Sequence, residues 1–488
     1  MSRKVEIILG PPGTGKTTRL LGMLEKYLND GGSMERVAFV SFSRRAIREV
    51  AVRLGKDLEE FPYFRTIHSL AYHFLDLDRD DVFQYKHWQI FADIVGMPFA
   101  AAGHEEPVWD GTLGDKVMAL HNLSRSRETE VEKEWRAAML PDLTLPVLQD
   151  TIRQFQKFKS ANALWDFHDM IDRAQGVLPV DLLFVDEAQD TSRASWSFLR
   201  RVAKDVPRVV LAGDDDQAVY AWSGADATAL GRFLGERTVL PQSYRLPRKV
   251  KALADHIISR AKHRVPKEFR PRKDKEGQEV EGVVTFRNEV STLDLRGKET
   301  WLLLARSNYQ LEEYRGLARS QGVVYTLPDG EWSYTLPPVR AAVTYERLRK
   351  GQEVTRSEVR SMLQFAVSQP KKLPPVVKWE DLYSEQALEV PWMQGLPHIS
   401  PSDREYIRAL RQGGEKLHGP GRVRIGTVHS VKGAEADNVV LKSDISERVT
   451  YGARIDPDSE HRVQYVGVTR ASNALHVILP QSATHWVF

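Results

Sequence analysis

The chain has 488 residues, of which 42% are hydrophobic, enough to build the cores of two to four domains. Its net charge is only +3, so any contact with nucleic acid must come from local basic patches rather than from overall charge. The absence of cysteine excludes disulfides, Fe–S clusters and thiolate zinc sites, and no apolar run reaches the ~18 residues that a membrane span requires.

A glycine-rich loop, residues 10–17 (GPPGTGKT), follows an apolar run that predicts a strand over 5–9. It precedes leucines at helical spacing that predict a helix over 18–27. This order is typical of a phosphate-binding loop, because glycines let backbone N–H groups approach the phosphates and the helix N-terminus adds positive charge. Lys16 is expected to reach the β- and γ-phosphates, and the Thr17 hydroxyl can ligate Mg²⁺. The loop predicts binding of a nucleoside triphosphate.

Residues 36–42 predict a second buried strand, and Ser43 is a plausible cap for a helix over 44–54. From about Asp76 to Asp166, Trp, Lys, Glu and Arg recur at helical spacing and strand signals are few. This stretch predicts a helical insertion in which individual side chains serve packing.

Acidic residues follow the next expected strand, 182–185. Asp186 can hold Mg²⁺, often through water, and Glu187 can polarise the water that attacks the γ-phosphate. A strand that ends in acidic residues is common by itself, but together with a phosphate loop it predicts hydrolysis of the bound nucleotide.

A further expected strand, 209–211, leads into the segment GDDDQAVYAWSGA at 213–225. Its three consecutive aspartates alone would suggest a metal cluster. Gln217, followed by Tyr220 and Trp222, indicates instead a sensor of the γ-phosphate joined to aromatic side chains that can stack on bases.

The second half of the chain predicts a second α/β domain. Its strands are expected over 283–286, 301–305, 323–327, 422–427 and 475–479, after residues 238–240, which lead into the segment QSYR (242–245). Between 248 and 275 there are eleven Lys and Arg residues and three Asp and Glu residues, which predict either a nucleic-acid track or a solvated helix. Residues 337–420 are rich in proline and partly helical.

Six segments in this order resemble the UvrD/Rep family of superfamily 1 DNA helicases. They are the phosphate loop, DEAQD (186–190), GDDDQAVYAWSGA (213–225), QSYR (242–245), TVHSVKGAEAD (427–437) and YVGVTRA (465–471). Weaker similarities to the family fill the gaps, at FVSFSRRAIREVAVRL (39–54), RTIHSLAYHFL (65–75) and DFHDMID (166–172). Together they cover most of the two motor domains of such a helicase.

The resemblance implies ATP and Mg²⁺ as cofactors. The implied catalytic residues are Lys16, Thr17, Asp186, Glu187, Gln217, Arg245 and Arg470, the two arginines contacting the γ-phosphate. The implied ATP-binding residues are Gly10, Pro11, Gly13, Thr14, Gly15, Lys16, Thr17, Thr18, Tyr244, which stacks on the adenine, and Glu435, which binds the ribose. The implied Mg²⁺ ligands are Thr17 and Asp186. The residues implied to bind nucleic acid are Ser43, His68, Tyr220, Trp222, His429 and Ser430.

The implied fold class is α/β, with two RecA-like P-loop motor domains that contain parallel sheets. Domain 1A is expected over 1–70 and 165–240, and domain 2A over 241–336 and 421–488. A helical insertion, 1B, is expected over 71–164. A 2B insertion over 337–420 is expected to be much smaller than in most relatives.

The chain also departs from the family pattern. No glutamine precedes the phosphate loop, where the family has a Gln segment that reads adenine, and Thr18 stands where the family tends to have Arg. The preference for ATP over other nucleotides is therefore open. Ser223 replaces a DNA-contacting Arg and Ile67 replaces a Phe, so Trp222 and Tyr220 are expected to supply more of the base stacking. A strand-separating hairpin after the last motif is expected to be missing or to come from elsewhere.

The resemblance implies an ATP-dependent helicase that moves 3′ to 5′ on single-stranded DNA, binds junctions with duplex DNA and unwinds them. A translocase that displaces bound proteins and unwinds weakly is an alternative, favoured by the small 2B segment. An ATP-gated nucleic-acid-binding scaffold is an alternative of another class, which is disfavoured by the intact Lys16, Glu187, Arg245 and Arg470. No residue of the sequence excludes RNA in place of DNA as the strand along which the protein moves. The first strand begins too early for a signal peptide, so we expect a cytoplasmic protein, bacterial or virus-encoded, without a membrane partner.

Overall fold

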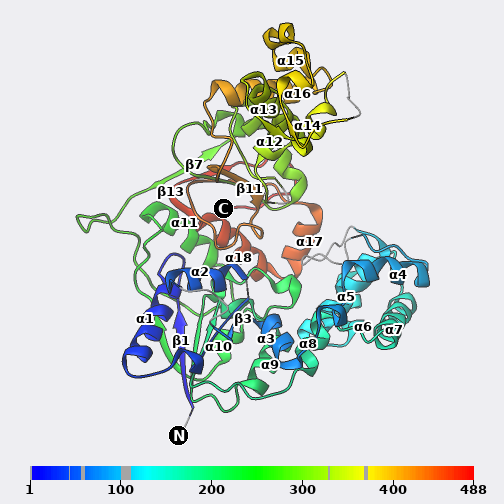
Figure 1. Cartoon of the computed structure of the whole chain (residues 1–488). Helices are drawn as coiled ribbons and strands as arrows, with labels where there is room; N and C mark the ends of the chain where they lie inside the picture. Colours follow the sequence, from blue (N-terminus) through cyan, green and yellow to red (C-terminus); the bar gives the residue numbers. More distant parts are fainter. Residues whose placement is uncertain (1–2, 43, 56–60, 101–110, 328–329, 368–371) are drawn as a thin grey trace. The chain divides into compact units, whose positions relative to one another are not determined.

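The computed structural model describes residues 3–42, 44–55, 61–100, 111–327, 330–367 and 372–488. The chain divides into two compact units (Figure 1). Unit 1 comprises Met1–Leu246, His256–Val280 and Asp456–Val466, and unit 2 comprises Pro247–Asp255, Glu281–Ile455 and Gly467–Phe488. Each unit contains one large parallel sheet, as the α/β assignment predicts.

The sheet of unit 1 has six parallel strands in the order β3-β2-β4-β5-β1-β6. They are β1 (Lys4–Leu9), β2 (Val37–Ser41), β3 (Phe64–Thr66), β4 (Leu182–Asp186), β5 (Arg208–Gly213) and β6 (Glu236–Val239). Both faces are covered by helices, namely α1 (Lys16–Asn29), α2 (Arg44–Arg53), α3 (Ile67–Leu75), α8 (Phe167–Arg173), α9 (Arg193–Val202) and α10 (Ala229–Arg232). Along β1, Ile8 belongs to the core on one face and Ile7 and Leu9 to the core on the other.

The parallel arrangement decides where the functional residues meet. All six strands of unit 1 end at the same edge of the sheet, so the segments that follow them are neighbours even when they are far apart in sequence. The phosphate loop follows β1, the aspartate-rich segment follows β5, and Asp186 ends β4. Because β5 lies between β1 and β4, these three segments are adjacent at that edge.

The stretch expected to be a helical insertion is helical. It contains α4 (Tyr85–Val95), α5 (Leu113–Arg127), α6 (Val131–Ala138) and α7 (Leu145–Ala161), which Figure 1 draws as one group of packed helices. These helices enclose their own core, in which Trp88, Phe91 and Phe155 are buried. Thr112 caps α5 and Asp166 caps α8, each accepting a hydrogen bond from a backbone N–H in the first turn.

The sheet of unit 2 has five parallel strands in the order β11-β8-β12-β13-β7. They are β7 (Val283–Arg287), β8 (Trp301–Ala305), β11 (Val423–Thr427), β12 (Ala436–Lys442) and β13 (Ala471–Ile478). The helices of this unit outside the insertion are α12 (Leu311–Ser320) and α17 (Glu447–Ile455). Two more helices, α11 (Arg248–Ile258) and α18 (Pro457–Val468), contribute residues to both units.

The proline-rich insertion of unit 2 is mostly helical. It contains α13 (Pro337–Arg349), α14 (Arg356–Leu363), α15 (Trp392–Gly395), α16 (Pro401–Gln412) and a short antiparallel pair, β9 (Val354–Thr355) with β10 (Val376–Val377). Tyr345 and Tyr406 of the insertion belong to the same hydrophobic core as Leu303 and Ile425 of the sheet. The insertion is therefore packed onto unit 2 rather than built around a core of its own.

The strands of unit 2 differ from the sequence-based expectation in two places. A strand predicted over 323–327 is wrong: Tyr325 forms a single bridge to Val423 and Thr326 a single bridge to Trp332, without a continuous ladder. Conversely, β12 was not predicted, because its apolar part is preceded by the polar residues Asp437 and Asn438. It nevertheless lies between β8 and β13 in the middle of the sheet.

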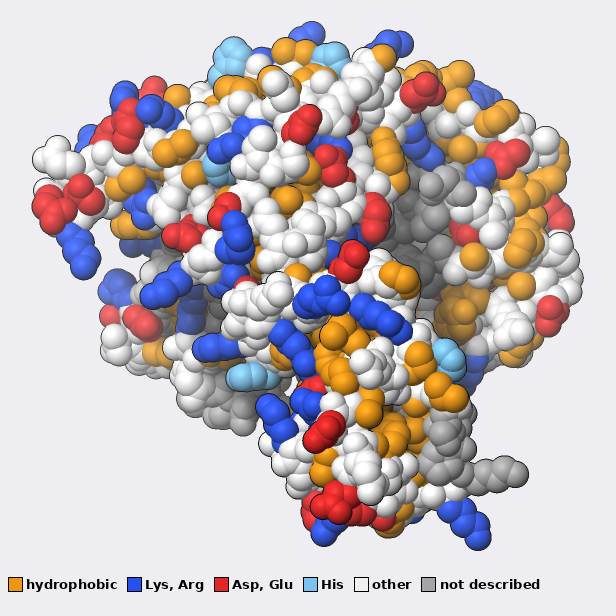
Figure 2. Space-filling model, turned by 90° about the horizontal axis from the view of Figure 1, so that it is seen from above, with side chains coloured by type: hydrophobic (Ala, Val, Ile, Leu, Met, Phe, Trp, Pro, Cys, Tyr) orange, Lys and Arg blue, Asp and Glu red, His pale blue; other side chains and the backbone are white. Residues whose placement is uncertain are grey.

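The surface carries charges of both signs. On the face drawn in Figure 2, basic, acidic and hydrophobic side chains are interspersed over most of the molecule. This agrees with the small net charge of the chain. Among the described residues, no helix combines the length and the apolar composition needed to cross a membrane.

Candidate nucleotide and nucleic-acid site

The phosphate loop joins β1 to α1 and is shaped by its glycines. A Cβ at Gly10 would lie 2.0 Å from Cγ of Lys16, and Gly13 has a φ of 69° with no room for a side chain beside Arg245. The Thr14 hydroxyl donates to the carbonyl of Pro11 at 2.8 Å. The loop is therefore closed on itself by tight contacts that only these small residues allow.

Lys16 and Thr17 begin α1 and face the end of β4. The Lys16 ammonium lies 3.1 Å from the carbonyl oxygen of Gly10 and 3.9 Å from a carboxylate oxygen of Glu187. The Thr17 hydroxyl donates to Oδ2 of Asp186 at 3.2 Å. Burial and the neighbouring Glu187 carboxylate raise the pKa of Asp186 above its usual range. The four residues that sequence analysis assigned to triphosphate, metal and attacking water thus meet at one edge of the sheet.

A chain of hydrogen bonds connects Glu187 to Gln217. The Gln189 amide donates to Glu187 at 2.5 Å, and its oxygen accepts from the backbone N–H of Asp214 at 3.0 Å. The Asp214 carboxylate in turn accepts from the Gln217 amide at 2.5 Å. The proposed water-polarising residue and the proposed γ-phosphate sensor are therefore held by one continuous network, with Gln189 between them.

The three consecutive aspartates do not form a metal cluster. Lys267, whose side chain is 1% exposed, lies 3.0 Å from both Asp214 and Asp216 and contacts Asp215 more closely. Arg264 forms a two-pronged ion pair with Asp216, at 2.8 and 2.6 Å. Burial alone would lower the pKa of Lys267, but the three carboxylates raise it above its usual range. Within the part of the chain that the structure describes, no group of three or more acidic or histidine residues is arranged to hold a metal ion.

The segment 242–245 lies against the phosphate loop in unit 1. The backbone N–H of Tyr244 donates to the carbonyl of Gly13 at 2.8 Å, and the Ser243 hydroxyl donates to the carbonyl of Pro12 at 2.8 Å. The Tyr244 ring is 70% exposed, so its face is accessible. These contacts place Tyr244 and Arg245 beside the phosphate loop, where both were expected to contact nucleotide.

Aromatic side chains gather where β2 and β5 end. Phe42 stacks on Tyr220 with 5.0 Å between ring centroids, and Tyr220 meets Trp222 edge-on at 5.7 Å. His68, after β3, is exposed and lies 5.7 Å from the ring of Phe167. The structure thus brings Tyr220 and Trp222 together and adds Phe42 to them. Ser43 lies outside the described residues.

The loop that carries Trp222 rests on the end of α5. The Arg127 guanidinium donates to the carbonyl of Ala221 at 2.9 Å. A Cβ at Gly224 would lie 2.3 Å from Cβ of Ser126, so the two backbones are in close contact. The helical insertion therefore contacts the loop over residues 220–224, which we call the aromatic loop.

The remaining predicted residues belong to unit 2. His429 is buried and Ser430 exposed after β11, and the Ser430 hydroxyl donates to the carbonyl of Thr427 at 2.9 Å. Arg470 is 2% exposed and its guanidinium donates to the carbonyl of Ala434 at 3.4 Å, next to the exposed Glu435. Arg470 and Glu435 are thus brought together around the loop between β11 and β12.

Comparison with known proteins assigns the chain to a family. Residues 2–236 match the UvrD/REP helicase N-terminal domain, and residues 406–482 match the UvrD-like helicase C-terminal domain. The two matches together cover more than half of the chain. The chain belongs to the UvrD-like helicase family. Its predicted membership is confirmed, and with it the expectation of two RecA-like domains built on parallel sheets.

Similar curated UvrD-like helicases are distant in sequence. The chain is 23% identical to the ATP-dependent DNA helicase PcrA of Bacillus subtilis, over 70% of this chain and 51% of PcrA. It is 23% identical to PcrA of Staphylococcus aureus over 75% of this chain and 54% of that protein, and 24% identical to DNA helicase II of Salmonella typhimurium over 54% and 39%. The chain spans about half the length of the PcrA proteins. A solved structure, the helicase nonstructural protein 10 of an arterivirus, shares 11% identity at a TM-score of only 0.36, covering 98% of this chain and 60% of its own.

The oxygen donors at the end of β4 suit Mg²⁺. Mg²⁺ prefers oxygen ligands and keeps several waters, so it needs only one or two protein groups beside the phosphates. The Thr17 hydroxyl and the Asp186 carboxylate provide two such oxygens within hydrogen-bonding distance of each other. Burial and the Glu187 carboxylate raise the pKa of Asp186 although Lys16 lowers it, and a bound cation would lower it further.

Sequence analysis missed three residues that the geometry makes relevant to a UvrD-like helicase. Gln189 connects Glu187 to Asp214, and its signal was its place within the acidic segment after β4. Phe42 is 39% exposed at the end of a fully buried strand, which is an available signal for a binding residue. Lys267 was visible only as one cation in the basic run, and nothing local marked it as buried.

The basic run is not one continuous track. Among the described residues, five of its cations form ion pairs: Arg248 and Lys249 with Glu281, Lys251 with Asp255, Arg264 with Asp216 and Lys267 with the aspartate cluster. Such pairs serve packing within each unit, so this part of the run favours a structural role over a nucleic-acid track.

Proposed function

We propose that the protein is an ATP-driven DNA helicase that translocates on single-stranded DNA and separates duplex strands. The observation that carries the proposal is the continuous network from Lys16 and Glu187 through Gln189 and Asp214 to Gln217. It connects the phosphate loop to the loop that carries the partly exposed Tyr220 and Trp222. A change at the γ-phosphate would thereby alter the position of side chains suited to stacking on bases.

Each of the predicted site residues would have a separate role in ATP binding or hydrolysis. Lys16 would bind the β- and γ-phosphates, and Glu187 would accept a proton from the attacking water. Arg245 and Arg470 would compensate the charge that rises on the γ-phosphate in the transition state. Thr17 and Asp186 would hold Mg²⁺, which supplies charge neutralisation at the phosphates. Tyr244 and Glu435 would contact the adenine and the ribose.

Steady-state ATPase measurements test the coupled motor. We expect strong stimulation by single-stranded DNA, with single-stranded RNA as the comparison for the track and GTP as the comparison for the nucleotide. A high rate without DNA, or no hydrolysis under any condition, would contradict a DNA-coupled motor. A Lys16→Ala variant that retained all biological activity would favour the scaffold function instead.

A forked duplex separates the helicase from the translocase. The second candidate, a translocase that strips proteins and unwinds poorly, is supported by the small insertion that packs into the core of unit 2. We expect strand separation on a fork with a 3′ single-stranded tail and none on a fork with a 5′ tail, since the resemblance implies 3′ to 5′ movement and binding at junctions. ATPase and displacement of end-bound streptavidin without strand separation would establish the translocase. A cytoplasmic location remains a prediction for either activity.

A further inference from the structure

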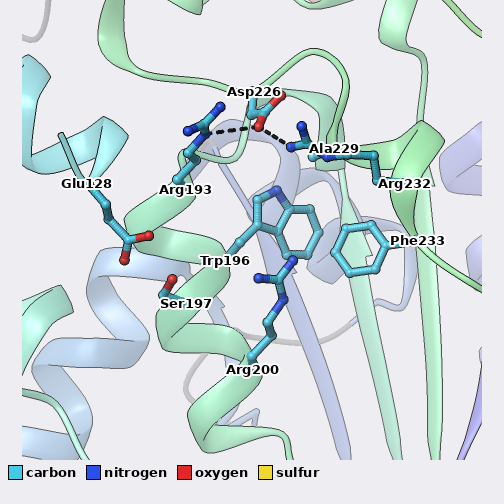
Figure 3. Close-up of a pocket in the computed structure, with 9 residues that line it drawn as sticks. All are labelled: Glu128, Arg193, Trp196, Ser197, Arg200, Asp226, Ala229, Arg232 and Phe233. Atoms are coloured by element: carbon cyan, nitrogen blue, oxygen red, sulfur yellow. Dashed lines mark hydrogen bonds and ion pairs between the residues drawn. The ribbon is translucent and has the colours of Figure 1, made fainter.

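A cavity of about 370 Å³ lies in unit 1 between α9 and α10, and none of its lining residues belongs to the predicted ATP or DNA set (Figure 3). Helix α9 presents Arg193, Trp196, Ser197 and Arg200 to it, at helical spacings of three and four residues. The opposite wall is formed by Asp226, Ala229, Arg232 and Phe233. Glu128 lies at its rim.

The cavity keeps excess positive charge. Arg193 and Arg232 donate to the same oxygen of Asp226, so two guanidinium groups share one carboxylate. Burial alone would raise the pKa of Asp226, but hydrogen bonds from Thr228 and Arg232 hold it below its usual range, and the carboxylate stays charged. Both side chains are more than half exposed, Arg193 at 53% and Arg232 at 60%. Each guanidinium keeps N–H groups that do not contact Asp226.

Arg200 is the cation with the greatest freedom to bind an anion. Its guanidinium lies 5.5 Å from the centre of the Phe233 ring, and it forms no ion pair with any residue that the structure describes. The cavity thus contains three guanidinium groups against two carboxylates, Asp226 and Glu128.

An apolar cavity adjoins the charged one. It measures about 270 Å³ and shares Trp196, Arg200 and Phe233 with its neighbour. Its other apolar lining residues come from α9 and from β1, β4 and β5, and they include Val5, Leu183, Val185, Leu199, Val209 and Leu211. Between the two cavities, the Trp196 indole N–H is buried and finds no acceptor among the described residues. Figure 3 shows this nitrogen on the side of the ring that faces Arg193, Asp226 and Arg232.

We propose that these two cavities form a binding site for a carboxylate carried on an aromatic or branched apolar group. The carboxylate would accept from Arg200 and the free donors of the arginine pair, and the apolar group would enter the space beneath Trp196 and Phe233. This chemistry is shared by a protein chain that ends in a residue such as Phe or Leu and by a free aromatic acid. A nucleotide fits less well, because its base would be buried mainly against aliphatic side chains, where Arg3 and Arg200 supply donors but the donor groups of the base meet no carboxylate.

Calorimetric titration of the whole 488-residue chain tests the site. A non-hydrolysable ATP analogue at saturation keeps ligands out of the phosphate loop. The probes are N-acetylphenylalanine, its uncharged amide and a glycine-rich hexapeptide ending in Phe. For the free acid, with about 15 non-hydrogen atoms, we expect a Kd on the order of 1 mM. The amide should bind at least about 10-fold more weakly because it lacks the charge.

Variants locate the binding. Arg200→Gln should weaken binding of the free acid about 10-fold, and it removes an exposed side chain without disturbing the core. Lys204→Gln, an exposed cation just beyond α9 that does not line the cavities, is the matched control and should leave binding unchanged. Trp196→Phe should weaken binding by a smaller factor, because it removes the indole N–H and reduces the aromatic surface but keeps an aromatic ring between the two cavities. Since Trp196 is a core residue, its variant is interpreted only if the thermal transition is retained.

The outcomes distinguish the sources and the alternatives. A hexapeptide that binds at least about 10-fold more tightly than the free acid identifies a chain terminus, and equal affinity identifies a small acid. Equal binding of acid and amide, no effect of Arg200→Gln, or tighter binding of thymidine monophosphate than of the acid would each overturn the proposal.

Discussion

Glu187 has a backbone φ of 51°, a conformation that non-glycine residues seldom adopt. Its side chain lies between Lys16 and Gln189 at the end of β4. Strained backbone held in place by such contacts is common where a side chain must be positioned for chemistry. The geometry therefore supports Glu187 as the general base and Gln189 as the residue that orients it.

Glu187→Gln should hydrolyse ATP at least ~100-fold more slowly than the parent protein, because the amide cannot accept the proton of the attacking water. Binding of ATP should be retained, since the triphosphate contacts of Lys16 and the loop are unchanged. Steady-state turnover and equilibrium binding measure the two effects separately. Near-normal turnover would remove Glu187 from the role of base.

Trp222→Ala should weaken binding of single-stranded DNA by roughly 1–3 kcal/mol regardless of sequence, the usual contribution of one stacked base. Tyr85→Ala provides the control, because Tyr85 is 80% exposed on α4 and belongs to the helical insertion. Fluorescence anisotropy with oligonucleotides of different composition measures both. Unchanged affinity would mean that Trp222 only packs against Tyr220.

Lys267→Met should lower the free energy of unfolding by about 3 kcal/mol, because it leaves buried carboxylates without their shared cation. It should also slow ATP hydrolysis, since Asp214 would no longer hold the Gln217 amide in a fixed position. Lys275→Met, at an exposed position of the same basic run, is the matched control for both effects. Chemical denaturation and ATPase assays report the two, and a stable but inactive Lys267 variant would assign the residue to positioning alone.

At the scale of elements, buried ion pairs join the helical insertion to α8. Lys159 of α7 contacts Asp166 and Asp169, the latter at 2.5 Å, and Arg125 of α5 lies 3.0 Å from each of the same two carboxylates. Lys159 itself is 2% exposed. The DFHDMID segment therefore has a structural use at the junction of three helices, independent of any contact with nucleotide.

This junction should lose stabilisation in acid. Burial alone would raise the pKa of Asp166, but Arg125 and Lys159 hold it below its usual range. A carboxyl group whose pKa is lower in the folded than in the unfolded protein stabilises the fold above its unfolded pKa of about 4. This stabilisation is lost as the pH falls from that value through the folded pKa. Urea unfolding followed by circular dichroism should thus show lower stability below about pH 4.

Lys159→Ala should cost about 3 kcal/mol at neutral pH and weaken that acid dependence, because it removes one of the two cations that pair with Asp166 and leaves Arg125 as the other. Lys157→Ala, an exposed lysine on the same helix, should change neither. An acid profile identical in the Lys159 variant and the parent would show that other groups control it.

The elements also show which parts of the fold were predictable. The residues after β1, β4 and β5 were found because each motif is local, and the parallel sheet then brings them together. By contrast, β12 was missed because strand propensity was weakened by its first polar residues, while its central place depends on neighbours far away in sequence. Lys267 was grouped with exposed cations because its partners are about 50 residues away, and charge alone does not reveal burial.

At the scale of the molecule, two units with separate sheets and separate cores predict unfolding in more than one step. A non-hydrolysable ATP analogue at about 100 times its Kd should stabilise the unit that holds the phosphate loop by about 2.7 kcal/mol. Calorimetry should show one transition moving upward with ligand. Lys16→Ala should abolish that shift, and a single transition unaffected by the analogue would contradict the assignment.

Helix α5 has one further mechanical property. It is 15 residues long, or about 22 Å, and its last turn meets the aromatic loop through Arg127 and Ser126. Because the C-terminal end of the helix contacts that loop, a rigid tilt of about 5° about this end would move the N-terminal end by ~2 Å. A shift of the loop over residues 220–224 that tilted α5 would therefore displace the far end of the helix more than the end at the loop.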